Sequence, residues 1–361
     1  MKIITIVGAR PQFVKAAVLS REFKKHTGIQ EVIVHTGQHF DSNMSAVFFD
    51  EMQIPQPQYS LDINGMGHGA MTGAMLAQIE QIIINERPDA VMVYGDTNST
   101  LAGALAAAKM HVPVIHVEAG LRSFNMHMPE EINRILTDRI SSLLFCPTDA
   151  AIENLEKEGF KDFTANYYKV GDVMEDAAIF YSGESARRAK VIQELKLETK
   201  PFALCTIHRA ENTDDLNNLR SIVSALNEIN RTLSIVLPLH PRTKKIFEVN
   251  NISPEFTVID PVGYFDMIEL LKKCTLVLTD SGGLQKEAFF FGKYCITLRE
   301  QTEWIELVEN GYNYIAGTDD KKIVRLAAKL AGREFPDKKN LYGNGAAASN
   351  ICKIINEQFN R

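Results

Sequence analysis

The chain has 361 residues, a formal net charge of −6 and an isoelectric point of about 5.9. This length is too great for one ordinary core and predicts two domains with a cleft between them. The acidic balance argues against a nucleic acid as the main partner, because binding a polyanion requires clustered positive charge, but it permits a local basic pocket for a small anion.

The cysteines and the amino terminus indicate the compartment. The five cysteines are an odd number without a C-x-x-C pair, and most lie in or beside apolar runs, which predicts buried core residues in a reducing compartment. The amino terminus enters a strand-like run without a signal core, and no apolar run approaches membrane-spanning length. We therefore expect a cytoplasmic protein without a membrane partner.

Short β-branched runs alternate with helix-length segments along the chain, which is typical of parallel sheets covered by helices on both faces. In the first half, we predict strands at residues 3–7, 32–35, 90–94, 114–117, 143–146 and 167–170. In the second half, we predict strands at residues 202–207, 234–239, 257–259, 276–279 and 295–298. A junction near residue 171 gives a first domain of residues 1–170, to which a closing helix at about 346–361 returns, and a second domain of residues 171–345. The predicted fold class is α/β, with two doubly wound parallel sheets.

The turn after the first strand, Gly8-Ala9-Arg10-Pro11, predicts an anion site. Pro11 suits the first turn of a helix, which would carry Lys15 one turn further on. Free amides, a positive helix end and two cations would favour an anion there. Only Gly8 of a G-x-G-x-x-G pattern is present, so NAD is not expected. The alternative is that Arg10 and Lys15 are ordinary surface cations.

Carboxylates follow two consecutive strands of the first half. Asp96 comes just after residues 90–94, and Glu118 comes directly after residues 114–117. Because open α/β sheets bind ligands at the carboxyl ends of their strands, we expect the two carboxylates to be neighbours in one crevice. Pro129 then starts a helix with Glu130 and Glu131 at its amino end. For these two residues, stabilisation of the helix end is an open alternative to chemistry.

The second half contains a stronger phosphate signal, in the turn after residues 276–279. Gly282 and Gly283 would let backbone amides approach a diphosphate, and Ser281 would add a hydroxyl donor. Glu287, about one helical turn further on, suits a pair of ribose hydroxyls. Glycine pairs are common in turns, so plain turn formation is the alternative.

Histidine and arginine side chains follow other strands of the second half and suggest a shared anionic ligand. His208 and His240 each come after an apolar strand, and Arg299 follows a third, with Glu303 close behind. The remaining histidines lack metal-ligand spacing and are interpreted as core, capping or substrate contacts, so no metal is expected.

Taken together, these motifs closely resemble the non-hydrolysing UDP-N-acetylglucosamine 2-epimerases, in family order over nearly the whole chain. The matching segments are Gly8-Ala9-Arg10-Pro11, Gly95-Asp96-Thr97, residues 116–122 (HVEAGLR), residues 129–134 (PEEINR), His208-Arg209, residues 280–283 (DSGG) with Glu287, and residues 299–303 (REQTE). The resemblance implies a GT-B-like fold of two Rossmann-like domains, an active site in the cleft between them, and a nucleotide held mainly by the second domain.

Other details are similar to one branch of the family, the UDP-2,3-diacetamido-2,3-dideoxy-glucuronate 2-epimerases of O-antigen synthesis. These are residues 35–41 (HTGQHFD), 122–126 (RSFNM) and 208–212 (HRAEN). Typical N-acetylglucosamine enzymes have Gly-Thr-Arg-Pro-Glu and His-Arg-Arg-Glu where this chain has Ala9, Gln12 and Ala210. The resemblance therefore implies the diacetamido substrate, with the ordinary N-acetylglucosamine substrate as the alternative.

The resemblance also implies a mechanism, in which UDP leaves C1 while a base removes the C2 proton and then adds back to the resulting glycal. The implied catalytic residues are Asp96, Glu118, Glu130 and His208, and the implied substrate-binding residues are Arg10, Lys15, Ser281, Gly282, Gly283, Glu287, Arg299 and Glu303. Which carboxylate serves which face of C2 stays open. No cofactor or metal is implied, and a homodimer is expected. The rival functions are a GT-B glycosyltransferase, a hydrolysing relative and a nucleotide-sugar sensor without enzymatic activity.

Overall fold

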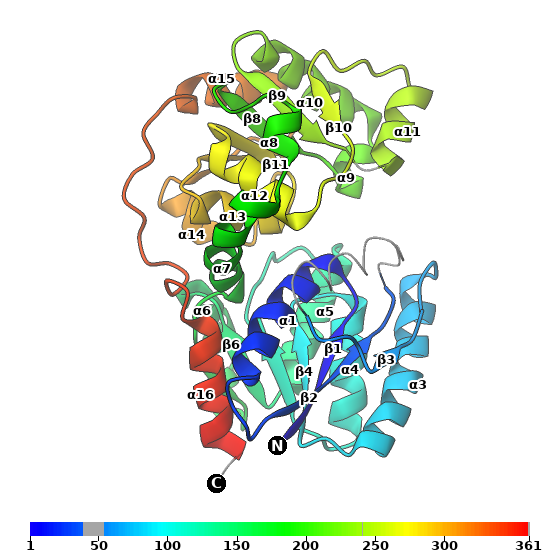
Figure 1. Ribbon diagram of the computed structural model, residues 1–361. Helices are drawn as coiled ribbons and strands as arrows, with labels where there is room; N and C mark the ends of the chain where they lie inside the picture. The colour runs from blue at the N-terminus through cyan, green and yellow to red at the C-terminus, as the bar shows by residue number, and fades with distance from the viewer. Residues whose placement is uncertain (39–53, 240, 360–361) are drawn as a thin grey trace. The chain divides into compact units, whose positions relative to one another are not determined.

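The computed structural model describes residues 1–38, 54–239 and 241–359, except the side chain of Arg10 (Figure 1). The chain divides into two compact units, one formed by Met1–Ala177 with Asn340–Arg361 and the other by Ala178–Lys339. The sequence places the junctions at residues 170 and 345, whereas the first division falls inside helix α7 (Val173–Arg188) and the second falls after Lys339. Each unit has its own parallel sheet, as predicted for the α/β class.

Within the described residues of the first unit, seven parallel strands pair in the order β3-β2-β1-β4-β5-β6-β7. The strands are β1 (Lys2–Val7), β2 (Gln30–His35), β3 (Tyr59–Ser60), β4 (Ala90–Tyr94), β5 (Val114–Val117), β6 (Leu143–Cys146) and β7 (Asn166–Lys169). The order reverses between β1 and β4, and such a switch point is where open α/β sheets leave a crevice for ligands. The helices of this unit are α1 (Arg10–Phe23), α3 (His68–Glu86), α4 (Asn98–Lys109), α5 (Pro129–Ile140), α6 (Asp149–Lys157) and α16 (Ala347–Phe359), with a 3₁₀ turn at Phe160–Asp162.

The second unit repeats this plan with six described strands in the order β10-β9-β8-β11-β12-β13. They are β8 (Phe202–Thr206), β9 (Ser234–Pro238), β10 (Thr257–Ile259), β11 (Leu276–Thr279), β12 (Cys295–Thr297) and β13 (Asn313–Ile315). Its switch point lies between β8 and β11. The helices are α8 (Val191–Glu194), α9 (Ala210–Thr213), α10 (Leu216–Asn230), α11 (Pro241–Val249), α12 (Tyr264–Lys273), α13 (Gly282–Phe290), α14 (Ile305–Glu309) and α15 (Asp320–Leu330).

Polar residues start several helices by accepting backbone N–H groups that the helix itself cannot satisfy. The Thr97 hydroxyl accepts the amide of Thr100 at the start of α4, and Thr148 accepts Ala151 at the start of α6. In the second unit, Asp215 accepts the amide of Asn217 at α10, 2.8 Å away. These caps fix where each helix leaves the sheet and therefore where the strand-end side chains lie.

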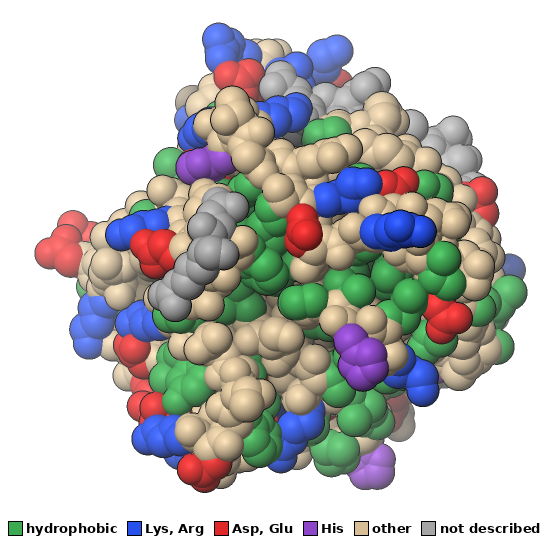
Figure 2. Space-filling view, turned by 90° about the horizontal axis from the view of Figure 1, so that it is seen from below, with side chains coloured by type: hydrophobic (Ala, Val, Ile, Leu, Met, Phe, Trp, Pro, Cys, Tyr) green, Lys and Arg blue, Asp and Glu red, His purple; other side chains and the backbone are tan. Residues whose placement is uncertain are grey.

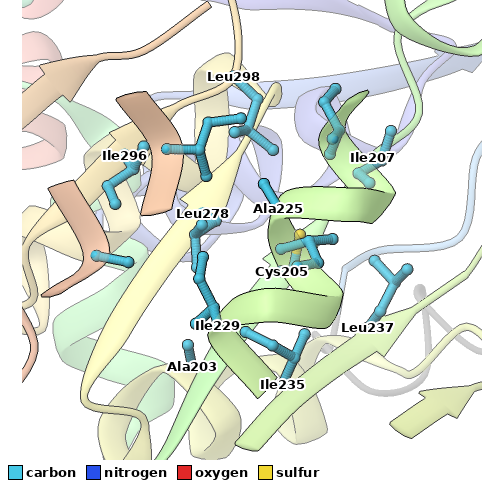
Figure 3. Packing of buried hydrophobic residues seen from close by; sticks show 14 of the residues in the cluster. Ala203, Cys205, Ile207, Ala225, Ile229, Ile235, Leu237, Leu278, Ile296 and Leu298 are labelled. Carbon is cyan, nitrogen blue, oxygen red and sulfur yellow. The ribbon is translucent and has the colours of Figure 1, made fainter. Parts of the chain in front are cut away.

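Apolar side chains from both faces of each sheet form the cores. In the second unit, α10 packs its buried face on the sheet, where Ala225 and Ile229 meet side chains of the strands, including Cys205 and Leu278 (Figure 3). All five cysteines are buried free thiols, as the sequence predicts. Burial of this kind contributes roughly 25 cal/mol per Å² of apolar surface to the stability of each unit.

The closing helix α16 belongs to the first unit and is fixed to the start of α7. Asp176 accepts the amides of Ala347 and Ala348 at 3.2 and 2.8 Å, and Glu175 accepts the amide of Asn344 at 2.8 Å. The two segments that connect the units are therefore joined by hydrogen bonds within the first unit.

The surface carries mixed charge. On the face seen in Figure 2, Lys and Arg side chains are interspersed with Asp and Glu side chains. None of the helices in the described part of the chain combines the length and apolar character that a bilayer span requires.

Candidate active site

Glu118 lies directly after β5 and is held in a rarely populated backbone conformation. Its φ angle is +71°, in the left-handed region that residues with a side chain seldom adopt. The amides of Glu118 and Ala119 both donate to the carbonyl of Phe145, at 3.0 Å each, which fixes this turn to β6. Its carboxylate accepts a hydrogen bond from Nζ of Lys15 on α1, and both side chains are buried. Backbone strain of this kind is concentrated at functional sites.

The neighbouring turn, after β4, packs against this ion pair. Gly95 has a φ of +61°, and a Cβ built on it would lie 3.2 Å from Oε2 of Glu118 and 3.3 Å from Nζ of Lys15. The next residue is Asp96, so Asp96 and Glu118 follow the adjacent strands β4 and β5, and their closeness in one crevice stays a prediction. Oδ2 of Asp96 accepts Nε and Nη2 of Arg134 at 3.0 and 2.8 Å, and its side chain is 31% exposed.

Helix α5 carries two residues that hold neighbouring loops, Arg134 and Glu131, and one candidate catalytic residue, Glu130. Arg134 also donates to Glu131 at 2.5 Å, and the buried carboxylate of Glu131 accepts the amides of Ser123 and Phe124 at 2.9 and 2.8 Å. Glu131 therefore holds the loop that precedes the helix. Glu130 is half-buried and, among the described groups, has no hydrogen bond or ion pair, so its carboxylate is available to a ligand.

The first predicted anion site is built differently from the expectation of free amides. Oε1 of Gln12 accepts the amides of Gly8 and Ala9 at 2.8 and 3.1 Å, so these donors are already used. Nε2 of Gln12 donates to the Tyr94 carbonyl at 2.8 Å. Gln12 is the third residue of α1, where a side chain commonly reaches back to the amides before a helix. Lys15 is held by Glu118 and is buried, which excludes the reading of Lys15 as an ordinary surface cation.

In the second unit, His208 and Asp280 meet at the switch point. Nδ1 of His208 lies 3.0 Å from Oδ1 of the buried Asp280, and the His208 side chain is 49% exposed. Asp280 also accepts the backbone amides of His208 and Arg209, both at 3.0 Å. Burial alone would raise the pKa of Asp280, but these hydrogen bonds and the charge of His208 outweigh it and leave the pKa below its usual range. The ionised Asp280 carboxylate thus orients the His208 imidazole through Nδ1.

The predicted phosphate turn follows β11. The hydroxyl of Ser281 accepts the Leu284 amide at the start of α13. Gly283 is exposed, and a Cβ built on it would meet only Oγ of Ser281, at 3.9 Å. The packing of Glu303 requires a glycine at position 282, because a Cβ there would lie 2.1 Å from Oε1 of Glu303. This requirement is independent of any ligand. Glu303 in turn pairs with the buried Arg299 at 3.1 Å.

Glu287 lies on α13, one turn beyond the glycines, and is buried. The preceding Lys286 is also buried, and its Nζ lies 3.9 Å from the ring centre of Trp304. Three predicted elements lie outside the described residues: the side chain of Arg10, His240, and residues 39–41 of the HTGQHFD segment. Within the described ranges, no group of three or more His, Cys, Asp or Glu side chains is arranged to hold a metal ion.

Two Rossmann-like units with polar groups at both switch points define the GT-B-like class of α/β proteins. A family described as UDP-N-acetylglucosamine 2-epimerase matches residues 21–356, and the chain belongs to this family. The family resemblance drawn from the motifs is thereby confirmed, and the chain is a member of a family of UDP-sugar isomerases.

Individual relatives cover nearly the full chain. A UDP-2,3-diacetamido-2,3-dideoxy-D-glucuronate 2-epimerase from Pseudomonas aeruginosa is 55% identical over 356 residues, which is 98% of this chain and 99% of the relative. A crystal structure of Methanocaldococcus jannaschii UDP-GlcNAc 2-epimerase in complex with UDP-GlcNAc and UDP is 40% identical with a TM-score of 0.92, over 99% of this chain and 100% of that one. A co-structure of S. aureus MnaA with UDP is 32% identical with a TM-score of 0.90, over 99% and 97% of the two chains.

Three residues have supporting roles that the sequence did not predict: Gln12, which was named only as a difference between branches of the family, and Arg134 and Asp280. Each lay inside a quoted motif or beside one. The position of Gln12 at the start of a helix was a usable signal for a side chain that reaches back to the turn. The partners of Arg134 and Asp280 come from distant parts of the chain, with separations of 38 and 72 residues, so local spacing gave no such signal.

Proposed function

We propose that this protein catalyses the reversible epimerisation at C2 of a UDP-2-acetamido sugar, through elimination and re-addition of UDP. The observation that carries the proposal is the pair of carboxylate turns at the carboxyl ends of β4 and β5. There Glu118, held by Lys15, lies against Gly95, and Asp96 follows, held by Arg134. The family membership and the relatives solved with UDP or UDP-GlcNAc support the same reaction.

The chemistry explains why several carboxylates are needed. The C2 proton is not next to a carbonyl, so simple deprotonation faces a prohibitive barrier. In the proposed route, one carboxylate removes the C2 proton as the C1–O bond breaks, and the electron pair of the C–H bond forms the C1=C2 double bond of a glycal. The bonding pair of the C1–O bond leaves with UDP. A second acid then protonates C2 on the other face while UDP adds back to C1. Asp96, Glu118 and Glu130 are the proposed acid and base groups.

The second unit would hold the nucleotide. The proposed diphosphate contacts are the amides of Ser281, Gly282 and Gly283 and the imidazole of His208, which Asp280 orients. Glu287 is proposed to accept the ribose hydroxyls. Arg299 and Glu303 are proposed to complete the UDP site of the second unit. In the first unit, Arg10 and Lys15 are proposed as substrate-binding residues. The reaction needs no cofactor beyond these side chains.

The proposed substrate is UDP-2,3-diacetamido-2,3-dideoxy-glucuronate, which would be converted to its manno epimer for O-antigen or related polysaccharide precursors. The support is the P. aeruginosa relative at 55% identity, together with Ala9, Gln12 and Ala210 at positions where typical N-acetylglucosamine enzymes differ. The alternative substrate is UDP-N-acetylglucosamine, which the M. jannaschii relative at 40% identity favours. We further propose a homodimer in a reducing, cytoplasmic setting, which the five buried free thiols fit.

A side-by-side assay tests reaction and substrate together. The purified chain is incubated with each UDP-sugar at equal concentration, and NMR identifies the C2 epimer, free UDP and free sugar. We expect kcat/KM for the diacetamido-glucuronate to exceed that for UDP-N-acetylglucosamine by about 10²-fold or more, because a site that commits a cation to the sugar carboxylate would leave that cation unpaired with the neutral sugar. Comparable or reversed efficiencies would return the chain to the N-acetylglucosamine group. Transfer of the sugar to an added acceptor would indicate a glycosyltransferase instead.

A further inference from the structure

A network of four buried or partly buried ionisable side chains lies next to the Gly95 turn. Its members are His116, Asp138, Arg122 and Glu158. His116, on β5, is fully buried, and its Nδ1 lies 2.7 Å from Oδ1 of Asp138 on α5. Its Nε2 lies 2.7 Å from the carbonyl oxygen of Gly95, the residue that precedes Asp96. His116 therefore connects the interior of the first unit to the turn that carries a proposed catalytic group.

Arg122 connects Asp138 to Glu158 in this network. Oδ2 of Asp138 accepts Nη1 of Arg122 at 2.7 Å and the amide of Gly120 at 3.1 Å. Arg122 also donates Nε and Nη2 to the two carboxylate oxygens of Glu158, at 2.6 and 2.8 Å. Burial would raise the pKa of Asp138, but the hydrogen bonds and charges of His116 and Arg122 outweigh it and keep the pKa below the usual range. Asp138 is thus a carboxylate at neutral pH.

The geometry constrains the protons of His116. A carboxylate oxygen and a carbonyl oxygen can only accept hydrogen bonds, so each ring nitrogen faces an acceptor. In either neutral tautomer, one nitrogen would present its lone pair to an oxygen 2.7 Å away. With both nitrogens protonated, both contacts are hydrogen bonds.

Charge balance agrees with this assignment. Asp138 and Glu158 contribute two negative charges, and Arg122 contributes one positive charge, so a cationic His116 makes the set neutral. Another ionisable group near Asp138 is Cys146 on β6, and burial raises the pKa of its thiol well above the usual range, so the thiol is neutral. Beyond the Gly95 turn, Lys15 and Glu118 balance each other.

We propose that His116 is a doubly protonated positioning residue, which holds the Gly95 carbonyl and thereby fixes the turn that carries Asp96 and packs against Glu118. The catalytic consequence rests on the proposed epimerase function. The protonation state and the position of the turn do not.

The protonation state is tested on the full chain labelled with ¹⁵N-histidine. At pH 8 an ordinary exposed histidine is mostly neutral, but both nitrogens of His116 should still carry protons in the wild type. The His116 signals are assigned as those missing from the double variant His116→Gln with Asp138→Asn. In Asp138→Asn, the new amide can donate to Nδ1, so His116 should become neutral while Nε2 still donates to Gly95. A neutral His116 in the wild type at pH 8 would overturn the protonation claim.

The positioning role is tested with a variant in which no buried charge is left unpaired. His116→Gln alone removes one of the two charged partners of the buried Asp138, which keeps Arg122, and can fail to fold. The informative variant is therefore His116→Gln with Asp138→Asn. We expect its kcat to fall about 10- to 100-fold with KM changed less than about threefold, because a small misplacement of a catalytic group slows the chemical step. The control is His26→Gln, on the α1–β2 connection far along the chain from these turns, which should keep wild-type kcat.

The outcomes separate this proposal from the function itself. A folded double variant with wild-type kcat, or a crystal structure of it with an unmoved Gly95–Asp96 turn, would contradict the positioning role. If the wild type turns over no UDP-sugar, the proposed function fails, while the NMR spectrum and the crystal structure still decide the role of His116.

Discussion

Lys15 on α1 and Glu118 after β5 form a buried ion pair between residues 103 positions apart in sequence, with side chains only 8% and 9% exposed. The pair lies against Gly95 at the switch point of the first sheet. The hydrogen bond from Lys15 orients the Glu118 carboxylate. It also helps to retain the left-handed backbone of Glu118, a conformation that costs on the order of 1–3 kcal/mol.

Removing the cation should destabilise the fold. Lys15→Met leaves the Glu118 carboxylate buried without this partner, and we expect the free energy of unfolding to fall by about 3 kcal/mol. Urea unfolding followed by circular dichroism measures the loss. The double variant Lys15→Met with Glu118→Gln should recover much of the stability but none of the activity.

The matched control for Lys15 is Lys169→Met, which breaks the exposed pair with Asp149 and should cost less than about 1 kcal/mol. A Lys15→Met protein as stable as this control would contradict a structural role for the buried pair.

The three candidate acid and base groups should each be needed for turnover. Replacing Asp96 by Asn, or Glu118 or Glu130 by Gln, removes a titrating group without changing its size, and we expect kcat to fall by roughly 10²-fold or more. UDP affinity, measured by calorimetry, should change little. Glu153→Gln, on the exposed face of α6, serves as the control. Near-normal turnover in all three variants would remove the assignment of these carboxylates.

Acid should destabilise the second unit through Asp280. Its pKa is lowered in the folded state, so the unfolded chain takes up the proton first as the pH falls. The stabilisation is complete above the ordinary aspartate pKa of about 3.9 and is lost as the pH falls through the folded value. Fluorescence of Trp304, the single tryptophan, follows urea unfolding of this unit.

In Asp280→Asn, the loss of stability between neutral pH and pH 3 should be smaller than in the wild type. Asp149→Asn, which changes an exposed carboxylate, should keep the wild-type dependence. Equal acid sensitivity in Asp280→Asn and the wild type would show that Asp280 does not carry this effect.

Gln12→Glu should make the stability of the first unit fall as the pH rises. The new carboxyl could still accept the Gly8 and Ala9 amides, but its second oxygen would face the Tyr94 carbonyl and would need a proton there. Stability should be close to wild type below the ordinary glutamate pKa of about 4.3 and should fall as the pH rises above it, by about 2 kcal/mol at pH 8. Thermal unfolding across this range measures the trend. The control is Gln193→Glu, at an exposed position of α8. A stability difference between Gln12→Glu and the wild type that does not change with pH would contradict the role of Gln12 in holding the Gly8 and Ala9 amides.

The fold was largely predictable because buried parallel strands have a simple signal. The runs at residues 90–94, 114–117 and 143–146 match β4, β5 and β6 at both ends. Among the described strands, two were missed. One is β3, with two residues, and the other is β13, whose three residues Asn313–Ile315 include a half-buried tyrosine and lack a continuous apolar run. Such short edge strands are specified by pairing with a neighbour rather than by their own sequence.

The candidate site was predictable where it depended on strand ends, and not where it depended on side chains reaching across the fold. Asp96 and Glu118 lie where the strand pattern puts them, and His208 follows β8 as expected. The capture of the Gly8 and Ala9 amides by Gln12, and the need for Gly282 created by Glu303, involve particular rotamers in three dimensions. Local spacing contains no information on these contacts.

The central claim is that C2 is deprotonated on one face and reprotonated on the other by side chains that exchange with water. The most direct measurement is incubation of the protein with its UDP-sugar in heavy water, followed by NMR of both epimers at C2. The product epimer should carry deuterium at C2, and the recovered substrate should gain deuterium as the reaction reverses. Product epimer that fully retains the original C2 proton would contradict this mechanism.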